Sequence, residues 1–188
     1  SGGAGNLKGF LAKADGVWYI HGNSSDELLK ISEEEGTWEY YAPEDDEGER
    51  ELTETGTITY NAEYKIYDFE SENIFYPCEP VKNGILTFRN LSFIAGGESC
   101  DLGKFDGEWY LDGDRDQDYY AFESGEWQFY RAIGQGYSSV DFGYLDYRGG
   151  DKQSLTAVRT NYEEPFAEFA IESEDEVRSD GKTYVRLE

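Results

Sequence analysis

Hydrophobic and polar residues alternate along most of this chain, in short runs rich in aromatic and β-branched side chains. Alternation with a period of two places neighbouring side chains on opposite faces of a strand, so the pattern predicts β-structure. Only residues 7–13 and 25–30 would form a short turn of helix. The predicted strands are 17–22, 27–32, 37–42, 56–61, 64–69, 85–89 and 91–94, then 108–112, 119–123, 126–132, 140–147, 154–161, 167–173 and 183–187.

The chain carries one pattern twice. The segment 16–20, Gly-Val-Trp-Tyr-Ile, returns as Gly-Glu-Trp-Tyr-Leu at 107–111, and later matches follow in the same order. Self-similarity at such a period indicates a duplicated structural unit. The markers of the repeat are Gly16, Trp18, Trp38, Gly107, Trp109 and Trp127, which include all four tryptophans of the chain.

The repeat predicts the domain organisation and the fold class. We expect a tether or vector-derived stub at 1–12, a first β-repeat at 13–96 and a second at 97–188. About seven short strands in meander order predict an all-β protein of two tandem small antiparallel β-barrels, because closure removes exposed strand edges. A two-sheet sandwich, or one larger barrel built jointly by both repeats, remains an alternative.

Charge restricts the partners. The 188 residues include 41 acidic and 16 basic ones, for a formal net charge of −25, and both halves are acidic. Such a field repels phosphate backbones and anionic membrane surfaces, so we expect no nucleic-acid partner. The chain has no apolar run of the ~20 residues that a membrane helix needs, which predicts no transmembrane segment. Aromatic residues, at 16%, supply large side chains for two small cores.

The Gly-x-Trp-Tyr opening followed by a meander of strands resembles the lipocalin (calycin) group. The resemblance implies that Trp18 and Trp109 plug the closed end of a barrel. It also implies that a basic residue near the last strand packs over each tryptophan, with Arg186 and Arg89 as the candidates. The motifs at 122–127 and 143–147 are similar to small lipocalin-like repeats of secreted bacterial proteins.

The cellular location is predicted from the N-terminal residues. Ser1–Asn6 is small and Gly-rich, and the chain contains no Met. This is typical of the leader of an exported or lipid-anchored bacterial protein, so we expect an extracellular or cell-surface location; a vector-derived scar would also explain Ser1 and Gly2. Cys78 and Cys100 would form a disulfide or remain as two thiols.

One acidic segment resembles a calcium loop. Asp112, Asp114, Asp116, Asp118 and Glu123 have the 1, 3, 5, 7 and 12 spacing of such loops. An Asp-rich turn between strands is the alternative, since the first repeat lacks these carboxylates. Apart from this possible Ca²⁺, no cofactor is expected.

Nothing in the pattern indicates an enzyme. The single histidine, His21, has Asp112 as its counterpart in the second repeat. Carboxylate pairs arise by chance among so many acids, although a carboxylate-based hydrolase remains a third hypothesis.

Tyrosines are the candidate ligand contacts. One residue of each adjacent aromatic pair faces outward on a strand, and we take Tyr41, Tyr119, Tyr130 and Tyr137 as ligand-binding candidates, with core filling as the alternative. The sequence therefore favours a non-catalytic extracellular binding module of a bacterial surface protein. Its partner would be a glycan, a peptide, a small apolar molecule or another extracellular protein. A structural spacer of the cell envelope is the second hypothesis.

Overall fold

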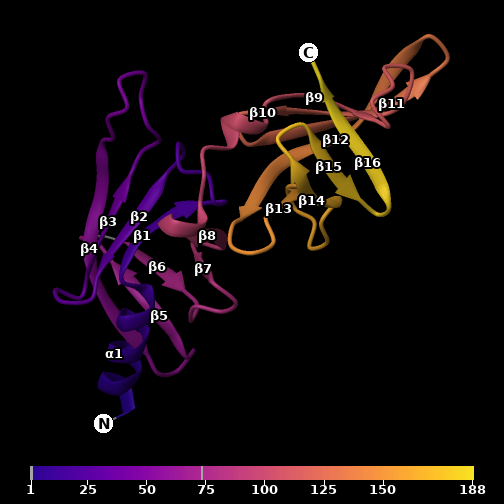
Figure 1. The fold of residues 1–188 in the computed structure, drawn as a ribbon. Coiled ribbons are helices and arrows are strands. Elements are labelled where there is room, and N and C mark those ends of the chain that lie inside the picture. The colour runs from indigo at the N-terminus through magenta and orange to yellow at the C-terminus, as the bar shows by residue number, and fades with distance from the viewer. Residues whose placement is uncertain (1, 73) are drawn as a thin grey trace. The chain divides into compact units, whose positions relative to one another are not determined.

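The computed structural model describes residues 2–72 and 74–188, and its regular secondary structure is mostly β-strand (Figure 1). The chain divides into two compact units, Ser1–Cys100 and Asp101–Glu188. Each unit contains one closed antiparallel barrel of eight strands in meander order. The prediction of two tandem barrels is confirmed, and the alternatives of a sandwich and of one joint barrel are excluded.

The first barrel closes where its last strand pairs with its first, Trp18 lying opposite Ala95. Its elements are α1 (Gly2–Ala14), β1 (Gly16–Ile20), β2 (Leu28–Ser32), β3 (Thr37–Tyr41), β4 (Leu52–Asn61), β5 (Ile66–Glu70), β6 (Phe75–Cys78), β7 (Ile85–Phe88), β8 (Leu91–Ala95) and the 3₁₀ helix η1 (Gly96–Glu98). Strand β6 was not predicted because it contains Pro77. It tolerates the proline because its register with β7 is limited to the pair Cys78 and Phe88.

The second barrel closes in the same way, Trp109 lying opposite Arg186. Its elements are η2 (Leu102–Phe105), β9 (Gly107–Leu111), β10 (Tyr119–Glu123), β11 (Glu126–Ile133), β12 (Gly136–Arg148), β13 (Ser154–Val158), β14 (Ala167–Ser173), β15 (Glu176–Ser179) and β16 (Lys182–Leu187). Strand β15 was missed because charged residues surround its single buried side chain, Val177.

Helix α1 replaces most of the expected tether at 1–12; residue 1 lies outside the described residues. Phe10 is buried and stacks on Tyr67, with ring centroids 3.9 Å apart. The Tyr67 hydroxyl donates to the Asn6 carbonyl at 3.1 Å. This segment therefore contributes to the core of the first barrel. None of the described helices is long and apolar enough to cross a membrane.

The repeated opening motif has the same structural role in both barrels. Gly16 and Gly107 have φ angles of 112° and 135°, which strongly favour glycine. The indole of Trp18 donates to the Ala14 carbonyl at 2.7 Å, and that of Trp109 to the Phe105 carbonyl at 2.9 Å. Each tryptophan thus ties the first strand to the helix before it, which explains why this motif recurs.

The aspartate before each glycine also has one role in both units. Asp15 Oδ1 accepts the amide hydrogen of Glu33, and Asp106 Oδ1 accepts that of Ser124, each at 2.7 Å. Both acceptors hold the turn between the second and third strands of their barrel. The repeat therefore conserves a backbone anchor as well as a core residue.

Arg186 lies over Trp109, with its guanidinium carbon 5.1 Å from the ring centroid, as the resemblance implied. It also donates to the Lys104 carbonyl at 2.7 Å and pairs with Asp175 at 2.8 Å. The expectation for Arg89 is wrong, because the position opposite Trp18 is occupied by Ala95.

Of the two alternatives for the cysteines, the structure has two thiols, since Cys78 and Cys100 are not bonded to each other. Cys78 is fully buried within the first barrel. Cys100 lies beyond β8, where its backbone forms a parallel bridge with Asn23. Burial raises the pKa of the Cys78 thiol, so this thiol stays protonated and unreactive.

Candidate functional site at the mouth of the second barrel

The two barrels differ at several interior positions. At three of them the first barrel has a large aromatic residue and the second a small one, and strand register establishes which positions correspond. Counting from the equivalent glycines Gly56 and Gly143, the residues two further on pair with Phe69 and with Ala157. The pairs across the next strand are Tyr76 and Ala167.

The third position lies at the turn before the last strand. Phe88 pairs with Leu91, four residues before Ala95, and Ser179 pairs with Lys182, four residues before Arg186. Phe88 and Ser179 are therefore equivalent. The side chains of the second barrel are smaller at these three positions, whereas Tyr120, Phe122 and Phe169 are larger than their counterparts Leu29, Ile31 and Cys78.

The corresponding end of the first barrel is filled. The guanidinium of Arg89 lies 4.8 Å from the ring centroid of Tyr76 and 5.4 Å from that of Tyr40. The Tyr40 hydroxyl donates to Glu27 at 2.6 Å, and the Tyr76 hydroxyl donates to Glu54 at 2.8 Å. Burial, followed by the Glu27 hydrogen bond, raises the pKa of Tyr40, so its hydroxyl remains a donor. The hydroxyls of Tyr40 and Tyr76 at this end of the first barrel are therefore both hydrogen-bonded.

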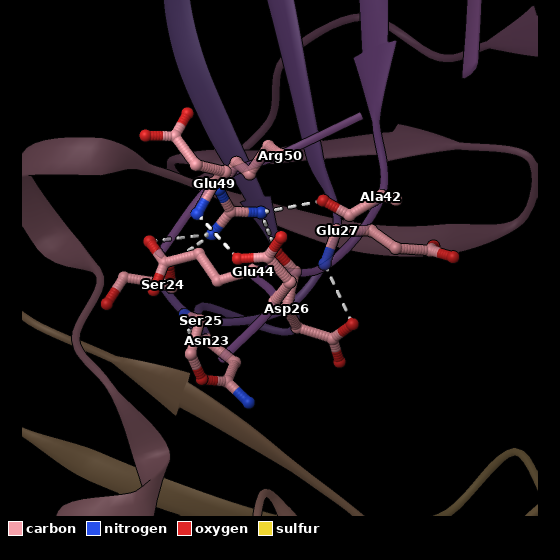
Figure 2. A network of polar contacts seen from close by, with 10 residues as sticks. Asn23, Ser24, Ser25, Asp26, Glu27, Ala42, Glu44, Glu49 and Arg50 are labelled. Carbon is pink, nitrogen blue, oxygen red and sulfur yellow. Dashed lines mark hydrogen bonds and ion pairs between the residues drawn. The ribbon is translucent and has the colours of Figure 1, made fainter. Parts of the chain in front are cut away.

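A second cation holds the loops beside this end in place. Figure 2 shows the Arg50 guanidinium among the backbone carbonyls of two loops. It donates to Ser24 at 2.6 Å, to Ala42 at 3.0 Å and to Asp26, and it pairs with Glu44 at 3.3 Å. One partly buried arginine thus fixes the loop after β1 against the loop between β3 and β4.

The second barrel has a pocket at its corresponding end. The mouth pocket is an open depression of about 630 Å³, and the small residues Ala167 and Ser179 are in its lining, whereas Ala157 is not. Its aromatic walls are Tyr120, Phe129, Phe166 and Tyr184. Phe166 precedes β14 and stacks on Trp127, with ring centroids 4.8 Å apart. A volume of this size is in the range of sites that hold small organic molecules.

Two tyrosine hydroxyls in the mouth pocket have no hydrogen-bond partner among residues 2–72 and 74–188. They belong to Tyr120 and Tyr184, each 5% exposed, whose ring centroids are 5.1 Å apart. Burial raises the pKa of both side chains, with Tyr184 and Asp118 adding to the effect on Tyr120. Neither hydroxyl oxygen is among the described buried side-chain atoms that lack a partner, so both are open to solvent in the pocket and can donate to water or to a ligand.

The tyrosines predicted from sequence do not line this pocket. Three of them gather on the outer face of the second barrel: Tyr119 stacks on Tyr130 at 4.7 Å and meets Tyr137 edge-on at 4.8 Å. Tyr110, which sequence reasoning missed, extends the row at 4.8 Å from Tyr119. Tyr41 lies in the first barrel, where its hydroxyl donates to Glu39 at 3.1 Å.

The sequence did not identify the pocket residues, because alternation along a strand does not show which of two adjacent aromatic residues faces the barrel interior. Tyr119 and Tyr120 are adjacent on β10, and only the register shows that Tyr120 faces inward. The repeat markers are better predicted, since Trp18, Trp38, Trp109 and Trp127 are all buried in the cores.

The predicted calcium loop does not form a metal site. Within the described ranges, no group of three or more His, Cys, Asp or Glu side chains is placed to hold a metal ion. The segment is a turn between β9 and β10: Asp114 Oδ1 accepts the amide hydrogen of Asp116, and Asp118 Oδ1 that of Ala132, each at 2.9 Å. Asp112 and its counterpart His21 take the same left-handed conformation, with φ angles of 53° and 54°.

Comparison with protein families, with curated proteins and with solved structures found no match to this chain. The function is therefore argued from the two barrels alone.

Proposed function

We propose that this chain is a non-catalytic binding protein that holds a small organic ligand in the mouth pocket of the second barrel. The observation that carries the proposal is the mouth pocket itself, where Ala167 and Ser179 stand at the positions of Tyr76 and Phe88 in the first barrel. A pocket with aromatic walls and two hydroxyl donors has the composition of a ligand site.

The titration behaviour of the pocket supports binding rather than catalysis. A general acid or base works best with a pKa near the operating pH. The pKa values of Tyr120 and Tyr184 are raised above the ordinary value, which moves them away from that range. Both hydroxyls therefore act as fixed hydrogen-bond donors at neutral pH.

The finer assignment is a lipocalin-like module acting at a bacterial cell surface. Its support is the Gly-x-Trp opening of each barrel and the packing of Arg186 over Trp109. The strongly acidic composition suits a soluble extracellular module whose ligand is neither nucleic acid nor an anionic membrane.

A spacer role is a second proposal for the first barrel. Arg89, Tyr40 and Tyr76 occupy the end of this barrel. The two tyrosine hydroxyls already donate to carboxylates. In this division of roles the first barrel supports and presents the second.

Fluorescence of N-phenyl-1-naphthylamine, a neutral aromatic probe, tests the proposal. The wild-type chain should bind it with a blue-shifted emission and quench tryptophan fluorescence. Ala167→Tyr installs the residue found at the equivalent position of the first barrel and should abolish binding. Ala170→Tyr places the same side chain at an exposed position of the same strand and serves as the matched control. Absence of wild-type binding, or equal binding by Ala167→Tyr, would contradict the proposal.

A further inference from the structure

We infer that the ligand of the mouth pocket is an amphipathic organic anion, with an apolar or aromatic body and a carboxylate or sulfonate head group. This inference rests on the proposed function and adds the chemical class of the ligand. It starts from two basic side chains, Arg131 and Lys182, that line the pocket.

Both cations lack an ion-pair partner within the described part of the chain, although acids outnumber bases 41 to 16 overall. Other arginines are engaged: Arg50 pairs with Glu44, Arg159 with Asp141 and Arg186 with Asp175. Arg131 and Lys182 are exposed and lie beside the aromatic walls without a direct ion pair.

Three carboxylates line the same pocket: Asp118, Glu168 and Asp180. Asp118 already accepts the amide hydrogen of Ala132 at 2.9 Å. Among the described residues, none of the three carboxylates lies within ion-pair distance of Arg131 or Lys182. The N–H groups of both cations can therefore bind an incoming anion.

The hydroxyls of Tyr120 and Tyr184 point to the same class of ligand. Their raised pKa values keep them protonated, so they offer two O–H donors to acceptor atoms. An oxyanion head would accept from these hydroxyls and from the N–H groups of Arg131 and Lys182. Hydrogen bonds to charged groups are stronger than those between neutral groups. The body of the ligand would pack on Phe129 and Phe166, which line the pocket.

Two probes that share one skeleton separate this inference from the proposed function. N-phenyl-1-naphthylamine is neutral, and 8-anilino-1-naphthalenesulfonate adds one sulfonate to the same ring system. The wild-type chain should bind the anionic probe about tenfold more tightly, which corresponds to one strong charged contact, despite the net charge of −25.

Arg131→Gln and Lys182→Gln should each lower the ratio of sulfonate-probe affinity to neutral-probe affinity about fivefold. Lys152→Gln, at an exposed lysine outside the pocket, is the matched control for the loss of one charge. Equal or weaker binding of the sulfonate probe beside normal binding of the neutral one overturns the inference alone. Insensitivity of the sulfonate probe to both variants also overturns it. Failure of both probes to bind overturns the proposed function itself.

Discussion

Gly143 is the position at which a single methyl group should do most damage to the second barrel. A Cβ at this residue would lie 1.8 Å from the Val158 carbonyl oxygen and 3.0 Å from Nε1 of Trp127. That indole donates to the same carbonyl at 3.1 Å, so Gly143→Ala would separate β12 from β13 and break a hydrogen bond. The backbone must move because neither neighbouring atom belongs to a flexible side-chain end.

The cost follows from these two effects. Forced overpacking costs about 1–3 kcal/mol, and a buried N–H left without its acceptor adds about 1–3 kcal/mol. We therefore expect Gly143→Ala to lower the free energy of unfolding of the second barrel by about 2–6 kcal/mol. That is a large part of the stability of a small domain.

Urea unfolding followed by tryptophan fluorescence and circular dichroism measures this loss. Gly136→Ala is the matched control, since Gly136 lies on the same strand and its Cβ would meet nothing within 4 Å. The first barrel offers an independent copy, because a Cβ at Gly56 would lie 1.7 Å from the Glu70 carbonyl oxygen. Similar midpoints for Gly143→Ala and Gly136→Ala would refute the reasoning.

Three further predictions concern the remaining anchors. Phe10→Ala should destabilise the first barrel by about 3 kcal/mol in calorimetry, since it removes the ring stacked on Tyr67; an unchanged melting temperature would show that α1 is not part of the core. Arg186→Gln should cost the second barrel about 2 kcal/mol in urea unfolding through loss of the contacts to Trp109 and Lys104, whereas Arg178→Gln, at an exposed arginine of β15, should cost little. Raised pKa values at Tyr40 and Tyr120 favour the protonated side chains in the folded state. Stability is therefore fully present below about pH 10 and falls above it, where tyrosines of the unfolded chain ionise; a flat unfolding free energy from pH 9 to 11.5 would contradict these shifts.

Local pattern was sufficient for the barrel class and for most strands. In β1, β3 and β11, inward tryptophans alternate with half-buried or exposed residues, a signal that depends only on the period of a strand. The duplicated Gly-x-Trp motif was informative because a positive φ angle and a buried indole are local requirements.

Other elements depended on contacts distant in sequence. Helix α1 has little helical periodicity and four glycines, and its position depends on Tyr67, which the chain brings beneath it only when the barrel closes. The charged strand β15 and the proline-bearing β6 likewise form because neighbouring strands supply their partners.

The sequence by itself determined that two similar β-units exist, because hydrophobic alternation and the duplicated tryptophans are local patterns that need no knowledge of distant contacts. Only the tertiary structure decided which unit has an open end. Ala157, Ala167 and Ser179 are ordinary small residues until strand register places them opposite Phe69, Tyr76 and Phe88 of the first barrel. A cavity is a property of side chains from several strands packed together, so its volume has no signature in any one segment.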